Sequence, residues 1–125
     1  MKCILFDLDG TLVSTGGAGN RALNQVFLDQ YQISGAMNPI NPAGKTDPAI
    51  IREMFYQYFQ RDCSAQELFQ VQESYLKLLP KECSDSKTYF TMQGIPELLQ
   101  VLSKSNEKIS LYIKSRLPEL KVLNF

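Results

Sequence analysis

The sequence has 125 residues and contains no histidine. Catalytic triads and metal sites that use an imidazole are therefore excluded, and any general acid or base must be Asp, Glu, Lys, Tyr or Cys. The chain also has no net charge, with thirteen Lys and Arg against thirteen Asp and Glu. This balance removes the basic stripe on which sequence-independent nucleic-acid binding relies, so we expect no nucleic-acid partner.

Cysteine and long apolar runs are also scarce. Cys3, Cys63 and Cys83 are an odd number of cysteines without Cys-x-x-Cys spacing, which fits neither a disulfide framework nor a zinc knuckle, and we expect reduced, buried thiols. No segment approaches the roughly 18 apolar residues of a membrane span, and charge follows the N-terminus too soon for a secretory signal. We therefore predict a soluble, cytoplasmic protein with no membrane partner.

The hydrophobic pattern predicts two small lobes. Residues 3–6 form a continuous apolar run, typical of a strand buried on both faces of a parallel sheet. Residues 95–102 have the pattern of a short helix, and residues 109–113 that of a second strand. The small residues of 14–17 mark a change of direction, where we expect the boundary between the lobes.

Three consecutive helices are expected after this boundary. The first shows apolar residues at helical spacing. The second fits an N-cap at Asp47 with Pro48 in the first helical position. The third follows a capping box formed by Ser64 and Glu67, and Pro80 is expected to end it.

Two aspartates directly follow the first predicted strand. Asp7 and Asp9 lie at its carboxyl end, and ligands bind at this edge of open α/β sheets. Taken alone, Asp7 would cap a turn and Asp9 with Gly10 would be an ordinary turn dipeptide. The whole string favours a catalytic site instead: Phe6-Asp7-Leu8-Asp9-Gly10-Thr11-Leu12-Val13.

This string closely resembles the first signature of the haloacid dehalogenase (HAD) superfamily, Asp-x-Asp-Gly-Thr-Leu/Val. The resemblance implies a phosphatase in which Asp7 attacks the phosphoryl group to form an aspartyl phosphate. Asp9 would protonate the leaving alcohol and later activate water. Gly10 would let the turn pass close to the phosphate, and the Thr11 hydroxyl would orient the loop. The resemblance also implies Mg²⁺, held by the Asp7 side chain and the Asp9 main-chain carbonyl.

The resemblance extends to the helical cap of the phosphoglycolate phosphatase-like branch. Residues 44–48, Gly-Lys-Thr-Asp-Pro, are similar to the substrate-facing turn of that cap, and Lys45 would reach a phosphate or carboxylate of the substrate. The alternative is that this segment only caps a helix and leaves Lys45 in solvent. The resemblance thus implies an α/β fold. A partial Rossmann-like HAD core, residues 1–15 and 92–125, would carry an inserted α-helical cap, residues 16–91.

The resemblance ends near Ile109. A complete member of the family continues for about as many residues again and supplies a phosphate-binding Thr or Ser, a Lys and an acidic pair. Ser115 is the candidate for that hydroxyl, although Lys114 and Arg116 depart from the expected neighbours. We therefore expect truncation to impair the catalysis.

The expected function is hydrolysis of a small phosphorylated metabolite. The alternatives are an inactive remnant whose cap serves as a partner-binding module, and a phosphomutase that uses the same two aspartates. Loss of the later strands would also expose the edge of the first strand, which predicts self-association.

Overall fold

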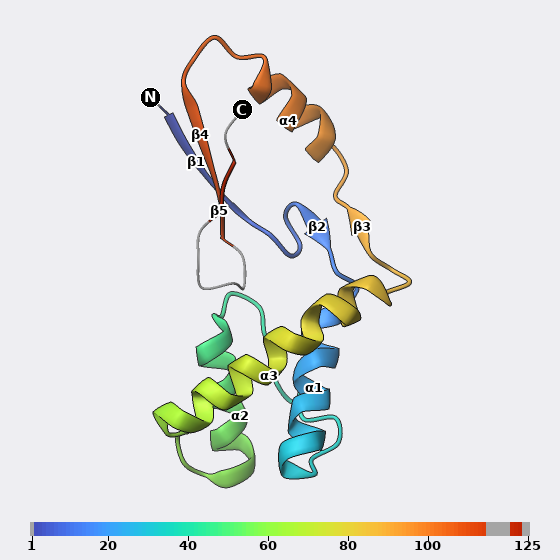
Figure 1. The fold of residues 1–125 in the computed structure, drawn as a ribbon, viewed down its shortest axis with the longest axis vertical. Helices are drawn as coiled ribbons and strands as arrows, with labels where there is room; N and C mark the ends of the chain where they lie inside the picture. The colour runs from blue at the N-terminus through green and yellow to red at the C-terminus, as the bar shows by residue number, and fades with distance from the viewer. Residues whose placement is uncertain (1, 115–120, 124–125) are drawn as a thin grey trace. The chain divides into compact units, whose positions relative to one another are not determined.

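The computed structural model describes residues 2–114 and 121–123 of the chain and has an α/β fold, as predicted (Figure 1). Contacts divide the chain into a strand unit, residues 1–16 and 87–125, and a helical unit, residues 17–86. The elements are, in order, β1 (Lys2–Asp7), β2 (Val13–Ser14), α1 (Ala18–Tyr31), α2 (Asp47–Phe59), α3 (Ala65–Ser84), β3 (Phe90–Thr91), α4 (Ile95–Ser103), β4 (Ile109–Lys114) and β5 (Lys121–Leu123).

The strand unit contains a three-stranded sheet in the order β1-β4-β5. β1 and β4 run parallel from the pair Lys2–Ile109 to the pair Asp7–Lys114, and β5 pairs antiparallel with β4. A separate two-stranded ladder joins β2 to β3. The second predicted strand and the short helix before it are therefore confirmed as β4 and α4.

The predicted burial of the first strand on both faces is wrong. Every described residue of β1 is exposed or half-buried, and the Leu5 side chain is 63% exposed. Double burial needs a helix layer on each face of the sheet. Within residues 2–114 and 121–123, β1 is paired on one side only and α4 buries none of its own residues, so that double layer is missing.

The packed core lies in the helical unit, where α1, α2 and α3 meet. Aromatic rings contribute much of it, and the Phe27 and Phe55 rings meet edge to face with centroids 5.9 Å apart. In the described part of the chain, no helix combines the length and apolar character needed to cross a bilayer. The largest fully buried side chains are Tyr75, Phe27, Phe55, Leu23, Ile50, Ile51, Met54, Val26 and Val71.

The N-cap of α2 differs from the prediction by one residue. Thr46, not Asp47, is the cap, because its backbone is extended and its hydroxyl accepts a hydrogen bond from the Ala49 N–H. Asp47 is then the first helical residue, and Pro48 lies in the first turn, where a missing N–H costs nothing.

The start of α3 was predicted correctly, but its end was not. The Ser64–Glu67 capping box is present, and the Ser64 N–H donates to the Glu67 carboxylate at 2.7 Å. Pro80 does not end the helix, which continues to Ser84. The segment after the proline is held from α1, since Arg21 donates both to the Glu82 carboxylate and to its backbone carbonyl.

The cysteines are free, but the expectation that they are buried is wrong. Cys3 is exposed because it lies on the open strand β1. Cys63 and Cys83 are half-buried, and Cys63 packs at the margin of the helical core. Burial raises the pKa of the Cys63 thiol, and a hydrogen bond to Asp62 raises it further.

Candidate functional site

Asp7 occupies the carboxyl end of β1. Its register partner in the parallel ladder is Lys114, so β1 and β4 end together at the edge of the sheet where the sequence predicted a site. The Asp7 side chain is exposed, and its Oδ1 accepts a hydrogen bond of 3.0 Å from the Leu8 N–H. Asp7 therefore presents a carboxylate to solvent with one oxygen fixed by the backbone.

The loop after Asp7 is folded tightly on itself. The Leu8 carbonyl accepts from the N–H groups of Leu12 and Val13 at 3.0 and 3.1 Å, and the Gly10 N–H donates to the Val13 carbonyl at 2.7 Å. Gly10 has a φ of +82°, a left-handed conformation that other residues adopt only with strain. These bonds bring Asp9 into a bridge with Val13 at the start of β2.

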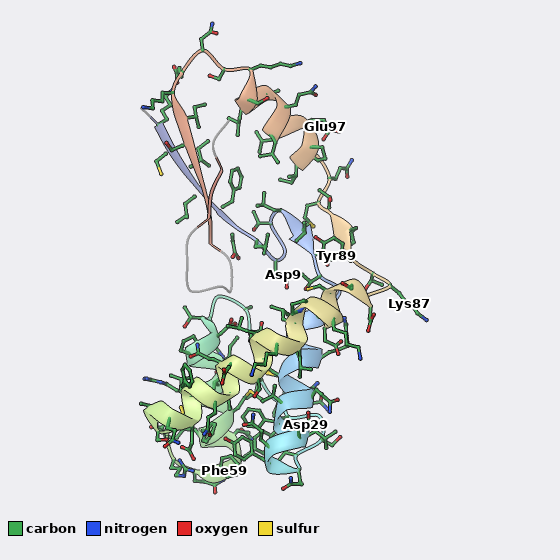
Figure 2. All side chains as sticks on the ribbon, in the orientation of Figure 1. Asp9, Asp29, Phe59, Lys87, Tyr89 and Glu97 are labelled. Atoms are coloured by element: carbon green, nitrogen blue, oxygen red, sulfur yellow. The ribbon has the colours of Figure 1, made fainter. Side chains whose placement is uncertain are left out.

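Asp9 is held by Thr15, a residue that sequence reasoning missed. The Thr15 hydroxyl donates to Asp9 Oδ2 at 2.9 Å, and the Thr15 N–H donates to Asp9 Oδ1 at 3.2 Å. Thr15 is only 9% exposed, and Figure 2 shows Asp9 on the loop between β1 and β2. Thr15 therefore contacts both oxygens of the second carboxylate, although the sequence presented it only as part of a flexible boundary.

The remaining predicted site residues to be placed are Thr11, Ser115 and Lys45. Thr11 is exposed on the same loop, and its role in orienting the loop stays a prediction. Ser115 lies outside the described residues. Lys45 belongs to the helical unit, whereas Asp7 and Asp9 belong to the strand unit.

Lys45 forms an ion pair that was not expected. Its Nζ lies 2.5 Å from Oε2 of Glu53 on α2, and the two side chains are 34% and 41% exposed. The backbone of Lys45 is also fixed, because its N–H donates to the Pro42 carbonyl at 3.2 Å. The lysine within the predicted substrate-facing turn is therefore paired with a carboxylate.

The two aspartates fit part of a magnesium site. Mg²⁺ prefers oxygen ligands and is usually held by one or two carboxylates together with water and substrate phosphate. The bridge between Asp9 and Val13 uses the Leu8 carbonyl and the Gly10 N–H, and does not use the Asp9 carbonyl. Across residues 2–114 and 121–123 there is no group of three or more acidic or cysteine side chains that could hold a metal. The two aspartates therefore supply oxygen ligands of the kind that Mg²⁺ prefers, but they are only part of a complete ligand set.

Comparison with known proteins identifies the family of the chain. The sequence profile of the haloacid dehalogenase-like hydrolases matches residues 4–116. The chain belongs to this family. Members of the HAD-like family typically use Mg²⁺. No curated protein matches the sequence.

Solved structures share the fold of this HAD-like chain. A proposed beta-phosphoglucomutase from Bacteroides vulgatus is similar with a TM-score of 0.62 and 16% identity, over 92% of this chain and 46% of its own. A proposed phosphatase from Clostridium difficile is similar with a TM-score of 0.54 and 16% identity, over 90% of this chain and 48% of its own. The chain thus spans about half the length of the structures that it matches.

Proposed function

We propose that this HAD-like chain carries the nucleophile and the acid–base group of a Mg²⁺-dependent phosphohydrolase of the phosphoglycolate phosphatase type. Its substrate would be a small phosphorylated metabolite. The observation that carries the proposal is the pair of carboxylates after β1, with Asp7 exposed at the strand end and Asp9 oriented by Thr15. The two groups have different surroundings, as two different roles require.

The chemistry has two steps. An Asp7 carboxylate oxygen attacks phosphorus, the bond from phosphorus to the ester oxygen breaks, and protonated Asp9 gives its proton to the departing alcohol. Asp9 then takes a proton from water, whose oxygen attacks the aspartyl phosphate. The bond between phosphorus and Asp7 breaks, and inorganic phosphate leaves. The net reaction is hydrolysis, and Asp9 ends protonated as it began.

The other predicted residues have supporting roles. The Asp7 side chain and the Asp9 carbonyl would hold Mg²⁺, which supplies positive charge against the phosphate when bound. Gly10 would let the loop pass close to the phosphate, and Thr11 and Ser115 would donate hydroxyl hydrogen bonds to the phosphate or its loop. Lys45 would bind a phosphate or carboxylate of the substrate.

The test is hydrolysis of p-nitrophenyl phosphate with and without Mg²⁺. We expect metal-dependent turnover that Asp7→Asn abolishes, because an amide is a poor nucleophile. Asp29→Asn is the matched control, since Asp29 is an exposed aspartate of α1 whose carboxylate accepts a bond from Gln25. Absence of turnover in the wild type would contradict the proposal and favour a module that only binds a partner.

A phosphomutase is the second candidate, favoured by the similarity of fold to the proposed beta-phosphoglucomutase. It would use the same aspartyl phosphate but return the phosphoryl group to a second hydroxyl of the sugar. Incubation with a sugar phosphate distinguishes the two candidates. A hydrolase releases inorganic phosphate, whereas a mutase yields an isomeric sugar phosphate.

A further inference from the structure

The outer edge of β1 has three residues whose backbone groups point away from the sheet. The Lys2 N–H donates to the Lys108 carbonyl at 3.0 Å, so Lys2 directs its backbone groups toward β4. Along a strand, the backbone N–H and C=O groups of successive residues alternate between the two edges. Cys3, Leu5 and Asp7 therefore direct theirs outward. Within the described residues β1 is the last strand in the order β1-β4-β5, so these outward groups join no ladder.

The side chains of the same three residues form the exposed face of β1. Cys3, Leu5 and Asp7 are exposed, whereas the two residues between them are half-buried. Leu5 is the central residue of the three and is 63% exposed. Residues 3–6 contain neither proline nor charge, the two features with which edge strands commonly avoid pairing. β1 therefore offers main-chain hydrogen bonds and an apolar side chain to another strand.

The position of Asp7 decides the direction in which a second copy would pair. In a two-fold dimer with parallel β1 strands, each residue lies at the height of the same residue in the other copy. The two exposed Asp7 carboxylates would then lie side by side, and like charges in this position are destabilising. An antiparallel pair places them at opposite ends of the ladder, and its bonds are slightly more stable per residue. Lys2 does not distinguish the two directions, because its Nζ lies 2.6 Å from Glu107 Oε2 of its own chain.

We propose a two-fold dimer in which the β1 strands of two copies pair antiparallel, with Leu5 opposite Leu5 of the second copy. In an antiparallel ladder, a hydrogen-bonded pair joins two residues that both direct their backbone groups to the partner strand. The register centred on Leu5 forms three such pairs, one between the Leu5 residues and two between Cys3 and Asp7. A register shifted by two residues forms only two such pairs among the same residues. The register centred on Leu5 therefore satisfies the most backbone groups.

This dimer places part of one copy beside the candidate site of the other. Cys3 of the second copy lies directly opposite Asp7, and a hydrogen-bonded pair sets their Cα atoms about 5.5 Å apart. The two side chains share a face of the sheet, as directly opposite residues do. β1 is then hydrogen-bonded along both edges up to Asp7. The dimer concerns assembly and does not depend on the proposed function.

Cysteine cross-linking tests the register. In a Cys3→Ser background, Leu5→Cys brings two thiols into a hydrogen-bonded pair with a Cα separation of about 5.5 Å, within disulfide range. We expect mild oxidation to give a disulfide-linked dimer on a non-reducing gel. Ile4→Cys in the same background is the matched control, because its Cα lies diagonal to that of the other copy at about 7–8 Å. It should give no more dimer than the free cysteines Cys63 and Cys83 give alone.

A mixture of two variants gives a positive test of the same register. Ile4 and Phe6 of the second copy lie opposite each other when Leu5 faces Leu5. Ile4→Cys and Phe6→Cys proteins, mixed in the Cys3→Ser background, should therefore form a cross-linked heterodimer that neither forms alone. Mass spectrometry of the linked peptides identifies it.

A proline variant tests the hydrogen bonds. Cys3→Pro removes only an outward N–H, so it keeps the bonds between β1 and β4. The dimer loses one bond from each copy, and its dissociation constant, measured by sedimentation, should rise about tenfold. Cys3→Ser keeps the N–H and should leave the dissociation constant unchanged. Circular dichroism should show the same spectrum for both variants.

Three results would overturn the inference. The first is a wild-type chain that stays monomeric at all concentrations. The second is a stronger cross-link in Ile4→Cys than in Leu5→Cys, which would mean a different register. The third is a dissociation constant that Cys3→Pro leaves unchanged, which would mean that the copies associate through another surface.

Discussion

Thr15 orients the carboxylate of Asp9. Its two oxygens accept from the hydroxyl and the N–H of Thr15, which is almost buried. A general acid works only if its carboxyl is within hydrogen-bonding reach of the departing oxygen. In the proposed mechanism Thr15 is therefore a positioning residue that acts through Asp9.

Thr15→Val tests this role, because valine keeps the shape of threonine and removes only the hydroxyl donor. We expect kcat for phosphate-ester hydrolysis to fall about tenfold with little change in KM, since the bond from the Thr15 hydroxyl to Asp9 is lost. Thr15→Ser restores the donor and should restore kcat. Steady-state kinetics of the three proteins checks this, and equal losses in the valine and serine variants would contradict it.

We expect Glu67 to contribute to the acid sensitivity of the helical unit. The guanidinium of Arg61 donates to both Glu67 oxygens, and the Ser64 N–H adds a third bond, which lowers the pKa of Glu67 from 4.5 to about 2. A carboxyl with a depressed pKa in the folded state contributes stability above its unfolded pKa and loses it as the pH falls. This contribution should therefore be lost between about pH 4.5 and pH 2.

Glu67→Gln isolates this effect, since glutamine keeps the side-chain acceptor of the capping box and cannot titrate. We expect the urea midpoint of the wild type to fall more between pH 5 and pH 2.5 than that of the variant. Circular dichroism at a helix wavelength follows the unfolding. Equal falls in the two proteins would show that other carboxyls dominate the acid response.

At the scale of the element, α3 contains a proline in its interior, where proline is unfavourable. Pro80 lies inside the helix, where it removes one backbone hydrogen bond and crowds the carbonyl four residues earlier. Pro80→Ala should therefore stabilise the helical unit by about 1–3 kcal/mol. Pro96 lies in the first turn of α4, where proline is tolerated, so Pro96→Ala should give no comparable gain. Thermal unfolding of the two variants provides the measurement.

The elements that the sequence predicted well are those with local signals. The Ser64–Glu67 box and the apolar spacing of the helices act within a few residues, and the structure contains them. The end of α3 depends instead on Arg21, which holds Glu82 from 61 residues away. The cap of α2 could not be assigned because Thr46 and Asp47 are both good capping residues.

The residues of the candidate site also differ in whether the local sequence marks them. Asp7 and Asp9 belong to a contiguous motif, so their type and spacing were enough to select them. The contact of Thr15 with Asp9 is made by folding, and nothing in the local sequence marks Thr15. The exposure of β1 was also beyond prediction, because burial depends on the layers that surround a strand and not on its own composition.

At the scale of the whole molecule, the buried apolar side chains are unevenly shared. The cluster of buried residues in the described ranges belongs entirely to the helical unit. Hydrogen exchange should therefore be slowest for the amides of α1, α2 and α3 and faster for those of β1. Exchange detected by mass spectrometry of peptides checks this, and slower exchange in β1 than in the helices would contradict it.

We predict that the chain self-associates through the outer edge of β1. β1 ends the order β1-β4-β5, and its Leu5 side chain is largely exposed. Exposed apolar edge strands tend to pair with other chains. We expect sedimentation to show a mass that rises with protein concentration, and Leu5→Lys should suppress the rise. A monomer whose mass does not change with protein concentration would contradict this. The cytoplasmic location is a separate expectation, and it stays a prediction.

The ladder between β2 and β3 joins the two ends of the helical unit. Ser14 and Phe90 are paired, so the chain leaves for the helical unit and returns from it one strand spacing apart, roughly 4.8 Å. The helical unit is therefore an insertion between the two strands of a β-hairpin. A short turn or another insert could connect these strands equally well. The candidate carboxylates Asp7 and Asp9 lie outside this insertion, so in the proposed function a change within the insertion would leave the reacting groups in place.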